Sequence, residues 1–354
     1  MASIGLVVLM SAGLAAAETK PDIRNLNVSA LKISATPIAN FGRAGAKTDT
    51  GKLEWRGGLL LQATHANFGG WSGLVVEPDG RRFLSVSDSG IWMSGEITYN
   101  GSAPAGIKDA RIGPLLTLDG KTLDRRKDRD AEAVALVSGD LQRGSILVSF
   151  EGNARIARYD FGASGVSATR GFLSLPDKAK KMRRNSGLEA MTLMKGGPYK
   201  GAVIAFSERM RDAKRNHVGW IWAEGVTEQM SLKDIGGFDV VDVASLEDGG
   251  IIVLERRFRW LEGLRIRLRK VAAGDLTTAG PITGETLLEA DLTSEIDNME
   301  GLALSRDAKG QMILTLISDD NFNQYLQRTL LLQFALPGDV AEPDAGPKTA
   351  KARP

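Results

Sequence analysis

Apolar residues recur in paired runs along the middle of the chain, and five of these pairs resemble one another. Each pair has a short apolar run, a polar turn that contains glycine, and a second apolar run that ends on a carboxylate. Two apolar runs joined by such a turn are typical of a β-hairpin. The pattern therefore predicts five hairpins, within residues 71–88, 131–151, 187–208, 241–255 and 298–319.

The hairpins return at a regular spacing. Acids open the first run of four of them, and Glu132, Glu189, Asp242 and Glu300 follow one another at nearly equal intervals. Each interval accommodates one four-stranded sheet with its loops, which needs about 40–50 residues. Long helical periodicity is missing, which argues against α/β barrels and doubly wound folds. The sequence therefore predicts an all-β protein, a β-propeller with five recognisable repeats in five or six blades of four-stranded antiparallel sheet.

The regions around the hairpins set the expected limits of this domain at residues 28–336. Residues 28–64 hold at least two further strands, which either complete the last sheet and close the ring or form a degenerate sixth blade. Residues 337–354 contain four prolines and almost nothing to bury. This composition predicts a disordered tail.

Residues 1–17 are apolar or small and carry no charge, and they end in three alanines. Such a segment is typical of a signal peptide with its cleavage site, and predicts a periplasmic or secreted protein. An uncleaved membrane anchor is the alternative, although the segment is short for a spanning helix. No other stretch is apolar without interruption over the length of a spanning helix. We therefore expect no stable membrane insertion after the signal is cleaved.

The amino-acid composition excludes several classes of function. Lys and Arg number 45 against 43 Asp and Glu, so the formal net charge of +2 provides no general attraction to nucleic acid. The absence of cysteine excludes disulfides, thiol catalysis and iron–sulfur clusters. The only histidines, His65 and His217, are too few for a multi-histidine zinc site. The sequence does not identify a protein partner.

Carboxylates carry the strongest chemical signal. A hairpin brings the start of its first strand and the end of its second to one edge, and three acid pairs have the same spacing across a hairpin: Glu132 and Glu151, Glu189 and Glu208, Glu300 and Asp319. In propellers the first strand of each blade lines the central channel. We therefore expect Asp242 and a set of metal-ligating carboxylates at one mouth of the channel, namely Glu132, Glu189, Glu300, Asp88, Glu151, Glu208, Glu255 and Asp319.

So many acids repel one another unless something neutralises them. A hard cation such as Ca²⁺, which takes six to eight oxygen ligands, is one candidate. Arginine, which pairs with carboxylates through a bidentate fork, is the other. Arg209, Arg256 and Arg257 follow their acids in the sequence and are the expected anion-binding residues. A mouth with both charges suits a small anionic or ester substrate, whereas the alternative is a framework of ion pairs that fixes the blades in register.

Other candidate groups are weaker. The segment Gly-Trp-Ser-Gly-Leu at residues 70–74 resembles a nucleophile elbow but lacks its final glycine, so Ser72 is interpreted as a strand residue. His65 or His217 is a candidate base, although a lone histidine is usually structural. The basic run at residues 178–184 is interpreted as a solvated loop, with an anion patch over the channel mouth as the alternative.

Several short motifs, taken in order, resemble those of a known family. They begin with Gly-Gly-Trp-Ser-Gly-Leu and Ser-Asp-Ser-Gly, and the full set lies at residues 69–74, 87–90, 130–134, 185–191, 254–258 and 298–302. Over residues 68–336 the chain resembles the phytase-like family, often called "esterase-like activity of phytase" proteins. The resemblance implies an exported bacterial β-propeller, distantly similar to calcium-dependent propeller phytases. By position it places the family's shared acids on Asp88, Glu132, Glu151, Glu189, Glu208, Glu255 and Glu300.

Two functional hypotheses follow. In the first, the protein is an exported metal-dependent hydrolase of phosphate or other esters, in which Glu132, Glu189 and Glu300 hold Ca²⁺ while Arg209 and Arg256 hold the anionic group. In the second, it is a non-catalytic periplasmic propeller that binds a ligand or a cell-envelope partner. An open metal position that faces the channel favours the first, and closure of the ring by ion pairs alone favours the second.

Overall fold

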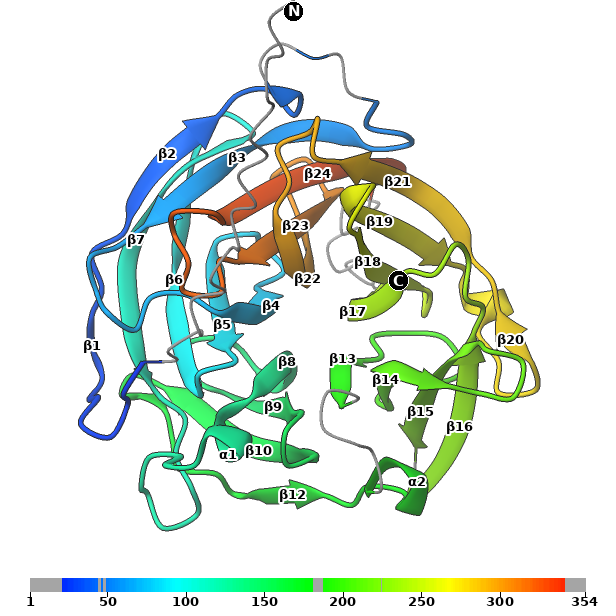
Figure 1. Ribbon diagram of the computed structural model, residues 1–354, viewed down its shortest axis with the longest axis horizontal. Coiled ribbons are helices and arrows are strands. Elements are labelled where there is room, and N and C mark those ends of the chain that lie inside the picture. The colour runs from blue at the N-terminus through cyan, green and yellow to red at the C-terminus, as the bar shows by residue number, and fades with distance from the viewer. Residues whose placement is uncertain (1–20, 44–45, 47–48, 181–186, 224, 341–354) are drawn as a thin grey trace, which may run out of the picture.

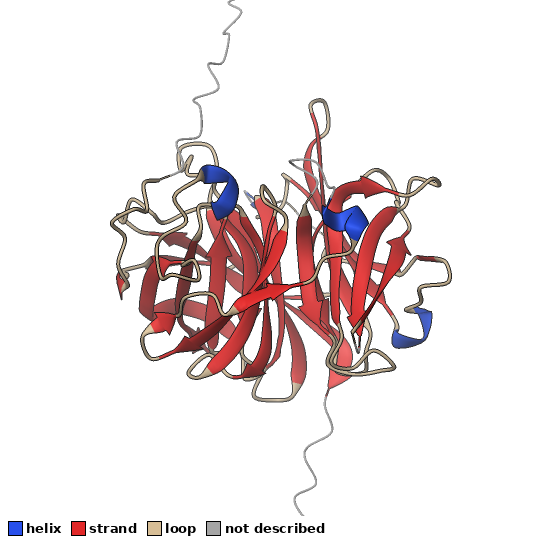
Figure 2. Cartoon of the chain, turned by 90° about the horizontal axis from the view of Figure 1, so that it is seen from below, coloured by secondary structure: helices blue, strands red, loops and turns tan. Residues whose placement is uncertain are grey.

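Five β-sheets are arranged in a ring around a common axis, as blades of a β-propeller (Figure 1). The computed structural model describes residues 21–43, 46, 49–180, 187–223 and 225–340. Viewed edge-on, strands make up nearly all of the regular structure, and the few helices are short (Figure 2). The predicted all-β propeller is confirmed, with five blades rather than six.

The first three blades follow one another along the chain, each with its innermost strand nearest the axis and its other strands further out. Blade 1 contains β4 (Trp71–Val76), β5 (Arg82–Ser87), β6 (Ile91–Asn100), β7 (Ala103–Pro114) and β1 (Ser29–Ala30). Blade 2 contains β8 (Ala131–Gly139), β9 (Gly144–Phe150) and β10 (Arg155–Gly162), with β11 (Gly165–Val166) and β12 (Gly171–Leu173) both paired to β10. Blade 3 contains β13 (Leu188–Leu193), β14 (Val203–Arg211), β15 (His217–Ala223), β16 (Val226–Leu232) and β20 (Pro281–Ile282).

The last two blades complete the ring. Blade 4 contains β17 (Asp239–Ser245), β18 (Ile251–Arg259), β19 (Gly263–Val271) and β21 (Glu285–Asp291). Blade 5 contains β22 (Asn298–Arg306), β23 (Gln311–Asp319), β24 (Thr329–Val340), β3 (Glu54–Gln62) and β2 (Ser34–Ile38). Strands β2 and β3 therefore come from the start of the domain and complete the last sheet, which decides between the two alternatives for residues 28–64 (Figure 1).

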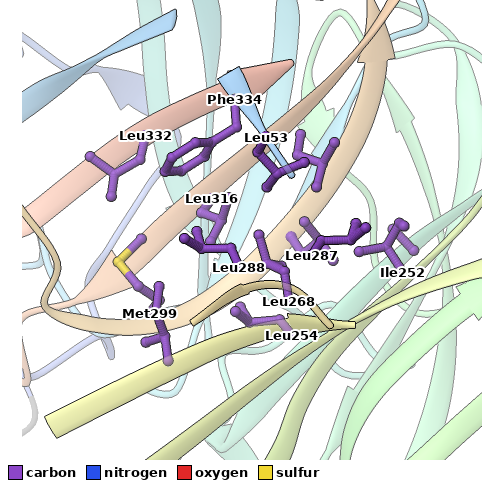
Figure 3. Close-up of a cluster of buried hydrophobic side chains, with 14 of the residues drawn as sticks. Leu53, Ile252, Leu254, Leu268, Leu287, Leu288, Met299, Leu316, Leu332 and Phe334 are labelled. Carbon is purple, nitrogen blue, oxygen red and sulfur yellow. The ribbon is translucent and has the colours of Figure 1, made fainter. Parts of the chain in front are cut away.

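Each of the five hydrophobic clusters lies between two neighbouring blades. Between blades 4 and 5, for example, Leu254, Leu268 and Leu288 pack against side chains of β22–β24, including Leu316 and Phe334 (Figure 3). Because both faces of a blade are covered in this way, its strands need apolar residues on both faces. This explains why the inner strands appear in the sequence as nearly continuous apolar runs rather than as strict alternation.

Strand β24 corrects the expected start of the C-terminal tail. The strand continues to Val340, which pairs with Gln311, so residues 337–340 belong to blade 5. The register against β23 breaks between Gln311 and Ile313, and Gly338 has a positive φ of +79°. The strand therefore forms a bulge here, which accommodates Pro337. Residues 341–354, the expected signal peptide at residues 1–17 and residues 181–184 of the basic run lie outside the described residues.

The described helices are single turns: α1 (Arg126–Arg129), α2 (Asp177–Lys180) and the 3₁₀ turn η2 (Ala273–Asp275). Within the described part of the chain, no helix has the length and hydrophobicity needed to cross a bilayer.

Candidate functional site

A β-bulge interrupts the inner strand of every blade at a corresponding place. In blades 1, 3 and 5 the residues left out of the pairing with the next strand are Ser72, Glu189 and Glu300. In blade 2 the irregularity covers Glu132. A bulge breaks the alternation of a strand and redirects the side chain at that point. In blades 1, 2, 3 and 5 it therefore turns one polar residue of an apolar strand toward the propeller axis.

The second strands end at the same mouth of the ring, where the terminal acids of blades 1, 2, 3 and 5 meet the bulge residues. Together they line a cavity of about 350 Å³. Seven of the eight predicted metal-ligating carboxylates line it: Asp88, Glu132, Glu151, Glu189, Glu208, Glu300 and Asp319. The equal spacing of acids across three hairpins thus located pairs that come together in space.

Two groups of carboxylate oxygens within this cavity lie close enough to share a cation. One oxygen from each of Asp130, Glu132 and Glu151 lies within 4.8 Å of the others, and the same holds for Glu151, Glu189 and Glu208. Glu151 belongs to both groups and also accepts a hydrogen bond from the Gly187 backbone nitrogen at 3.2 Å. A Cβ atom on Gly187 would lie 2.4 Å from Glu151 Cγ, so only glycine permits this approach.

Asp130 was not among the predicted site residues. It precedes β8 directly and lies between the single-turn helix α1 and the bulge at Glu132. The signal in the sequence was its position two residues before Glu132. The pairing of acids across hairpins did not include it, because Asp130 lies outside the first strand.

Burial and repulsion from neighbouring acids disfavour the ionised forms of Glu132 and Glu189. Burial raises the pKa of Glu132 well above its ordinary value, and the nearby Asp130, Asp88 and Glu151 raise it further. Burial likewise raises the pKa of Glu189, with added repulsion from Glu132 and Glu208. The pKa values of Glu300 and Asp319 are raised for the same main reason.

Arginines supply part of the neutralising charge. Arg256 donates to Glu300 and to the Asn298 side-chain oxygen, and its second terminal nitrogen lies 3.5 Å from Glu208. Arg209 Nε lies 2.7 Å from the other oxygen of Glu208, and the Arg209 side chain is 56% exposed. These two arginines oppose the effect of burial on Glu208, whose pKa is raised to about 7. Among the described residues, eight carboxyl groups and three arginines line the cavity, so acids outnumber arginines there.

Blade 4 departs from the prediction. Glu255 does not line the cavity but is fully buried against β19, where Arg267 Nε lies 2.8 Å from one of its oxygens and Arg269 contacts the other. The cause is the register: the bulge falls at Val241, and β18 pairs residue by residue with β19 from Ile251 to Arg259. Glu255 therefore faces the interior of the blade, and the next residue, Arg256, faces the channel.

Two more expected positions serve the framework. Arg257 does not line the cavity; its guanidinium lies 2.5 Å from Glu262 and 4.7 Å from the ring centre of Phe238. Asp242 is buried and accepts backbone hydrogen bonds from Val243 at 2.8 Å and from Leu302 of β22 at 2.6 Å. It therefore ties blade 4 to blade 5.

Neither histidine is among the described residues that line the cavity. His217 is fully buried on β15, and burial lowers its pKa to about 3, which keeps the imidazole neutral. His65 accepts a hydrogen bond from the Asn67 backbone nitrogen at 3.2 Å in the loop after β3. Ser72, the bulge residue of blade 1, does line the cavity but donates to the Gly70 carbonyl at 3.5 Å.

A second, larger cavity of about 1140 Å³ adjoins the first. The two share the side chains of Glu208, Arg209, Arg256, Glu300 and Asn321. The larger cavity extends outward over blades 4 and 5, so the acidic mouth opens into a groove at the edge of the ring.

The donor chemistry of the mouth suits a hard divalent cation. Every close ligand atom is a carboxylate oxygen, and Ca²⁺ binds such oxygens in flexible sets of six to eight. Glu189 is only 7% exposed and, within the described part of the chain, no side chain donates a hydrogen bond to it. A buried carboxylate without a donor is costly unless it is neutralised, so the residues present fit a bound cation.

A family model described as "Phytase-like: Esterase-like activity of phytase" matches residues 66–322. A comparison with curated protein sequences gave no match.

Similar solved structures include the catalytic domain of the Coprinopsis cinerea GH62 α-L-arabinofuranosidase, with 13% identity and a TM-score of 0.48 over 81% of this chain and 98% of that one. A thermostable family-43 glycoside hydrolase has 11% identity and a TM-score of 0.48, over 80% of this chain and 97% of that one. Because the family model spans most of the propeller, including its acidic mouth, the chain belongs to the phytase-like family.

Proposed function

We propose that the acidic mouth of the propeller binds a divalent cation, Ca²⁺, and that the protein hydrolyses phosphate or other esters there. The observation that carries the proposal is the cluster of carboxylates with close oxygens, open to two connected cavities. Two of its members, Glu132 and Glu189, have raised pKa values. A purely structural ion-pair network would be expected to balance its charges, whereas the described lining of this cavity has more acids than arginines.

The residues have distinct parts in this proposal. Glu132, Glu151 and Glu189, with Asp130 and Glu208, would hold the cation. Glu300 is the exception among the three acids first expected to ligate metal, because its carboxylate is engaged by Arg256 and Asn298. When bound, the cation neutralises the carboxylates and polarises an ester oxygen.

Arg209 and Arg256 would bind the anionic group of the substrate. Both line the smaller and the larger cavity, so their guanidinium groups lie on the boundary between the acidic mouth and the groove. Arg209 is the more exposed, and charge-assisted hydrogen bonds from arginine suit phosphate and carboxylate oxygens. Each of the two forms an ion pair with Glu208, which holds it beside the mouth.

A non-catalytic propeller that binds a periplasmic ligand or a cell-envelope partner is the second candidate. It is favoured by the ion pairs that Arg256 forms with Glu300 and Glu208, since these neutralise part of the mouth without a cation. In this case the protein would bind an anionic ligand at the same mouth without turnover.

One experiment separates these functions. The purified protein is assayed against a panel of aryl phosphates and acyl esters, with Ca²⁺ and with chelator. We expect turnover that requires Ca²⁺ and that is lost in Glu189→Gln, while the exposed control Glu228→Gln keeps it. Thermal melts accompany the assay, because a ligand that binds only the native state stabilises it by about 2.7 kcal/mol at a hundredfold excess over Kd.

An unchanged melting temperature between millimolar Ca²⁺ and excess chelator would reject the cation site. Ca²⁺ stabilisation without turnover of any ester would favour the binding module instead.

The proposal also includes export, with the mature protein beginning near Glu18 and residing in the periplasm or medium. Cell fractionation followed by N-terminal sequencing checks this expectation. Recovery of a full-length chain from the cytosol would contradict it.

A further inference from the structure

The groove beside the acidic mouth has a lining that the proposed function does not use. It lies between blades 4 and 5, with the β18–β19 hairpin on one side and residues 320–328, the β23–β24 loop, on the other. At its inner end it shares Arg209 and Arg256 with the mouth. A molecule held in the groove would therefore reach the carboxylate cluster directly.

Large apolar side chains line this groove and remain exposed. Phe258 of β18 is 66% exposed, and Leu292, which follows β21, is 45% exposed. From the opposite side, Tyr325 and Leu326 are 100% and 81% exposed. Polar side chains such as Asp239, Asp297 and Gln324 line the groove between them. A groove that exposes several large apolar side chains together with polar groups is typical of a ligand site.

The loop that carries Tyr325 is held in place rather than loose. The backbone nitrogen of Asn321 donates to Asp319 at 2.6 Å, and the Asn321 side chain donates to Gln327 at 3.0 Å. Asn321 and Phe322 both have positive φ, 48° and 52°, a strained conformation for residues other than glycine. Strain of this kind persists where the surroundings impose it, and it often marks a functional loop.

Glycines next to the loop support the same conclusion. A Cβ atom on Gly70 would lie 2.7 Å from the ring of Phe322 and 2.3 Å from Asp88 Oδ1. The Phe322 ring thus packs against backbone that has no side chain, immediately beside an acid of the mouth. The loop that presents Tyr325 and Leu326 to solvent is therefore anchored on the candidate site itself.

We propose that this groove binds a bulky apolar group of the substrate, so that the preferred substrate is an ester with its anionic end at Arg209 and Arg256 and an aryl or similarly large apolar group against Phe258 and Tyr325. The inference rests on the proposed function for the position of the anionic end. The position of the apolar group is inferred from the lining of the groove alone. A volume of about 1140 Å³ exceeds what a small phosphate ester would fill.

Binding of non-hydrolysable ligands tests the groove without turnover. Titration calorimetry with the full chain and Ca²⁺ compares 2-naphthylphosphonate, methylphosphonate and 2-naphthol. We expect 2-naphthylphosphonate to bind at least about tenfold more tightly than methylphosphonate, the effect of burying roughly 60 Å² of apolar surface. Phe258→Ala and Tyr325→Ala should reduce this preference several-fold and leave methylphosphonate binding unchanged.

The variants offer matched controls. Tyr325→Phe keeps the ring and should keep the preference, and Phe172→Ala removes a 54% exposed phenylalanine from β12 of blade 2. Tyr325 is fully exposed, so its substitution leaves the core intact. In hydrolysis assays, Phe258→Ala should raise KM for a naphthyl phosphate more than it lowers kcat.

The outcomes separate the two proposals. Equal affinity for the naphthyl and methyl phosphonates, or no effect of Phe258→Ala and Tyr325→Ala, would overturn the groove proposal. Binding of 2-naphthol that depends on both aromatic residues supports the groove even if no ester is turned over, in which case only the proposed hydrolysis fails. A concentration-dependent dimer abolished by Phe258→Ala would also overturn it, because the groove would then be an interface between two copies.

Discussion

The carboxyl groups of Glu132 and Glu189 occupy surroundings that favour their protonated forms. Burial is the larger cause for both, and repulsion from neighbouring acids adds to it. Glu208 differs because Arg209 and Arg256 offset part of the effect of burial, which leaves its pKa at about 7. Without a cation, ionising these groups at neutral pH therefore lowers the free energy of unfolding.

The pH dependence of stability follows from the direction of these shifts. A carboxyl group whose pKa is raised in the folded state stabilises the protein below its unfolded pKa, and the stabilisation is lost as the pH rises through the folded pKa. For Glu208 this range extends from its ordinary value of 4.5 to about 7. In chelator, we expect the melting temperature to fall between roughly pH 5 and pH 8, and Ca²⁺ to remove most of that fall.

Thermal melts of Glu132→Gln and Glu189→Gln check this prediction, since each should show a flatter profile in chelator than the wild type. Glu228→Gln, on an exposed position of β16, serves as the control and should follow the wild type. Identical profiles for all four proteins would show that the raised pKa values do not govern stability.

Arg256 links acids of two blades, and its removal should expose their repulsion. In Arg256→Met, Glu300 and Glu208 lose a common positive partner. We expect a loss of about 3–5 kcal/mol in chelator, typical of a buried pair with one partner removed, and a larger stabilisation by Ca²⁺ than in the wild type.

Denaturant unfolding measures the effect of Arg256→Met. Arg259→Met is the control, because Arg259 is 51% exposed where it pairs with Glu262, and exposed pairs contribute about 0–1 kcal/mol. Equal effects of the two substitutions would mean that Arg256 does not neutralise the mouth.

At the scale of single elements, strands β14 and β18 illustrate how register decides chemistry. Both end their apolar run with a glutamate followed by arginine, Glu208-Arg209 and Glu255-Arg256. In blade 3, Leu188 beside the bulge pairs with Ser207, whereas in blade 4 the corresponding Val240 pairs with Glu255. A difference of one residue reverses which side chain faces the axis. Equivalent sequences thus supply an acid to the mouth from blade 3 and an arginine from blade 4.

This difference predicts opposite behaviour for two similar substitutions. Glu255→Gln leaves Arg267 and Arg269 without a charged partner inside blade 4, so it should destabilise the protein by about 3–5 kcal/mol. Its stabilisation by Ca²⁺ should equal that of the wild type, because Glu255 does not line the mouth. Glu189→Gln should instead abolish most of the Ca²⁺ effect.

Melts with and without Ca²⁺ compare Glu255→Gln and Glu189→Gln directly. A loss of Ca²⁺ stabilisation in Glu255→Gln would contradict the assignment of Glu255 to the framework.

At the scale of the whole molecule, the geometry of the mouth depends on a closed ring. Strand β3, from the start of the domain, pairs with β24 at its end, for example Leu59 with Leu331. The inner strands also approach closely: a Cβ atom on Gly73 of blade 1 would lie 2.8 Å from the Val134 backbone nitrogen of blade 2. The mouth therefore depends on contacts between all neighbouring blades.

Removal of the closing strands tests this dependence. A chain that begins at residue 63 lacks β2 and β3 together with the short edge strand β1, and it exposes the edge of β24 and the apolar clusters on both sides of blade 5. We expect it to lose its cooperative thermal transition, whereas a chain that begins at residue 21 keeps both strands and should retain it. Circular dichroism melts measure the transition, and an unchanged transition in the shorter chain would contradict closure by these strands.

Much of the architecture was predictable because its signals are local. A hairpin is specified by two apolar runs and a turn between them, so the five repeats and the equally spaced acid pairs follow from neighbouring residues alone. Because both ends of a hairpin meet at one edge, seven of the eight expected acids do line one cavity. The sequence by itself therefore determined the fold class, the repeat and most of the acidic mouth.

Only the tertiary structure decided the features that depend on distant pairing and on register. No local signal shows that β3 joins β24, which closes the ring at five blades. A bulge shifted by one position places Arg256 rather than Glu255 at the channel. The similar sequences of β14 and β18 do not reveal this shift. Asp130 meets Glu132 and Glu151 within blade 2, because the segment before β8 folds back beside them. The apolar groove forms because side chains from separate blades converge there, and that convergence exists only once the ring is closed.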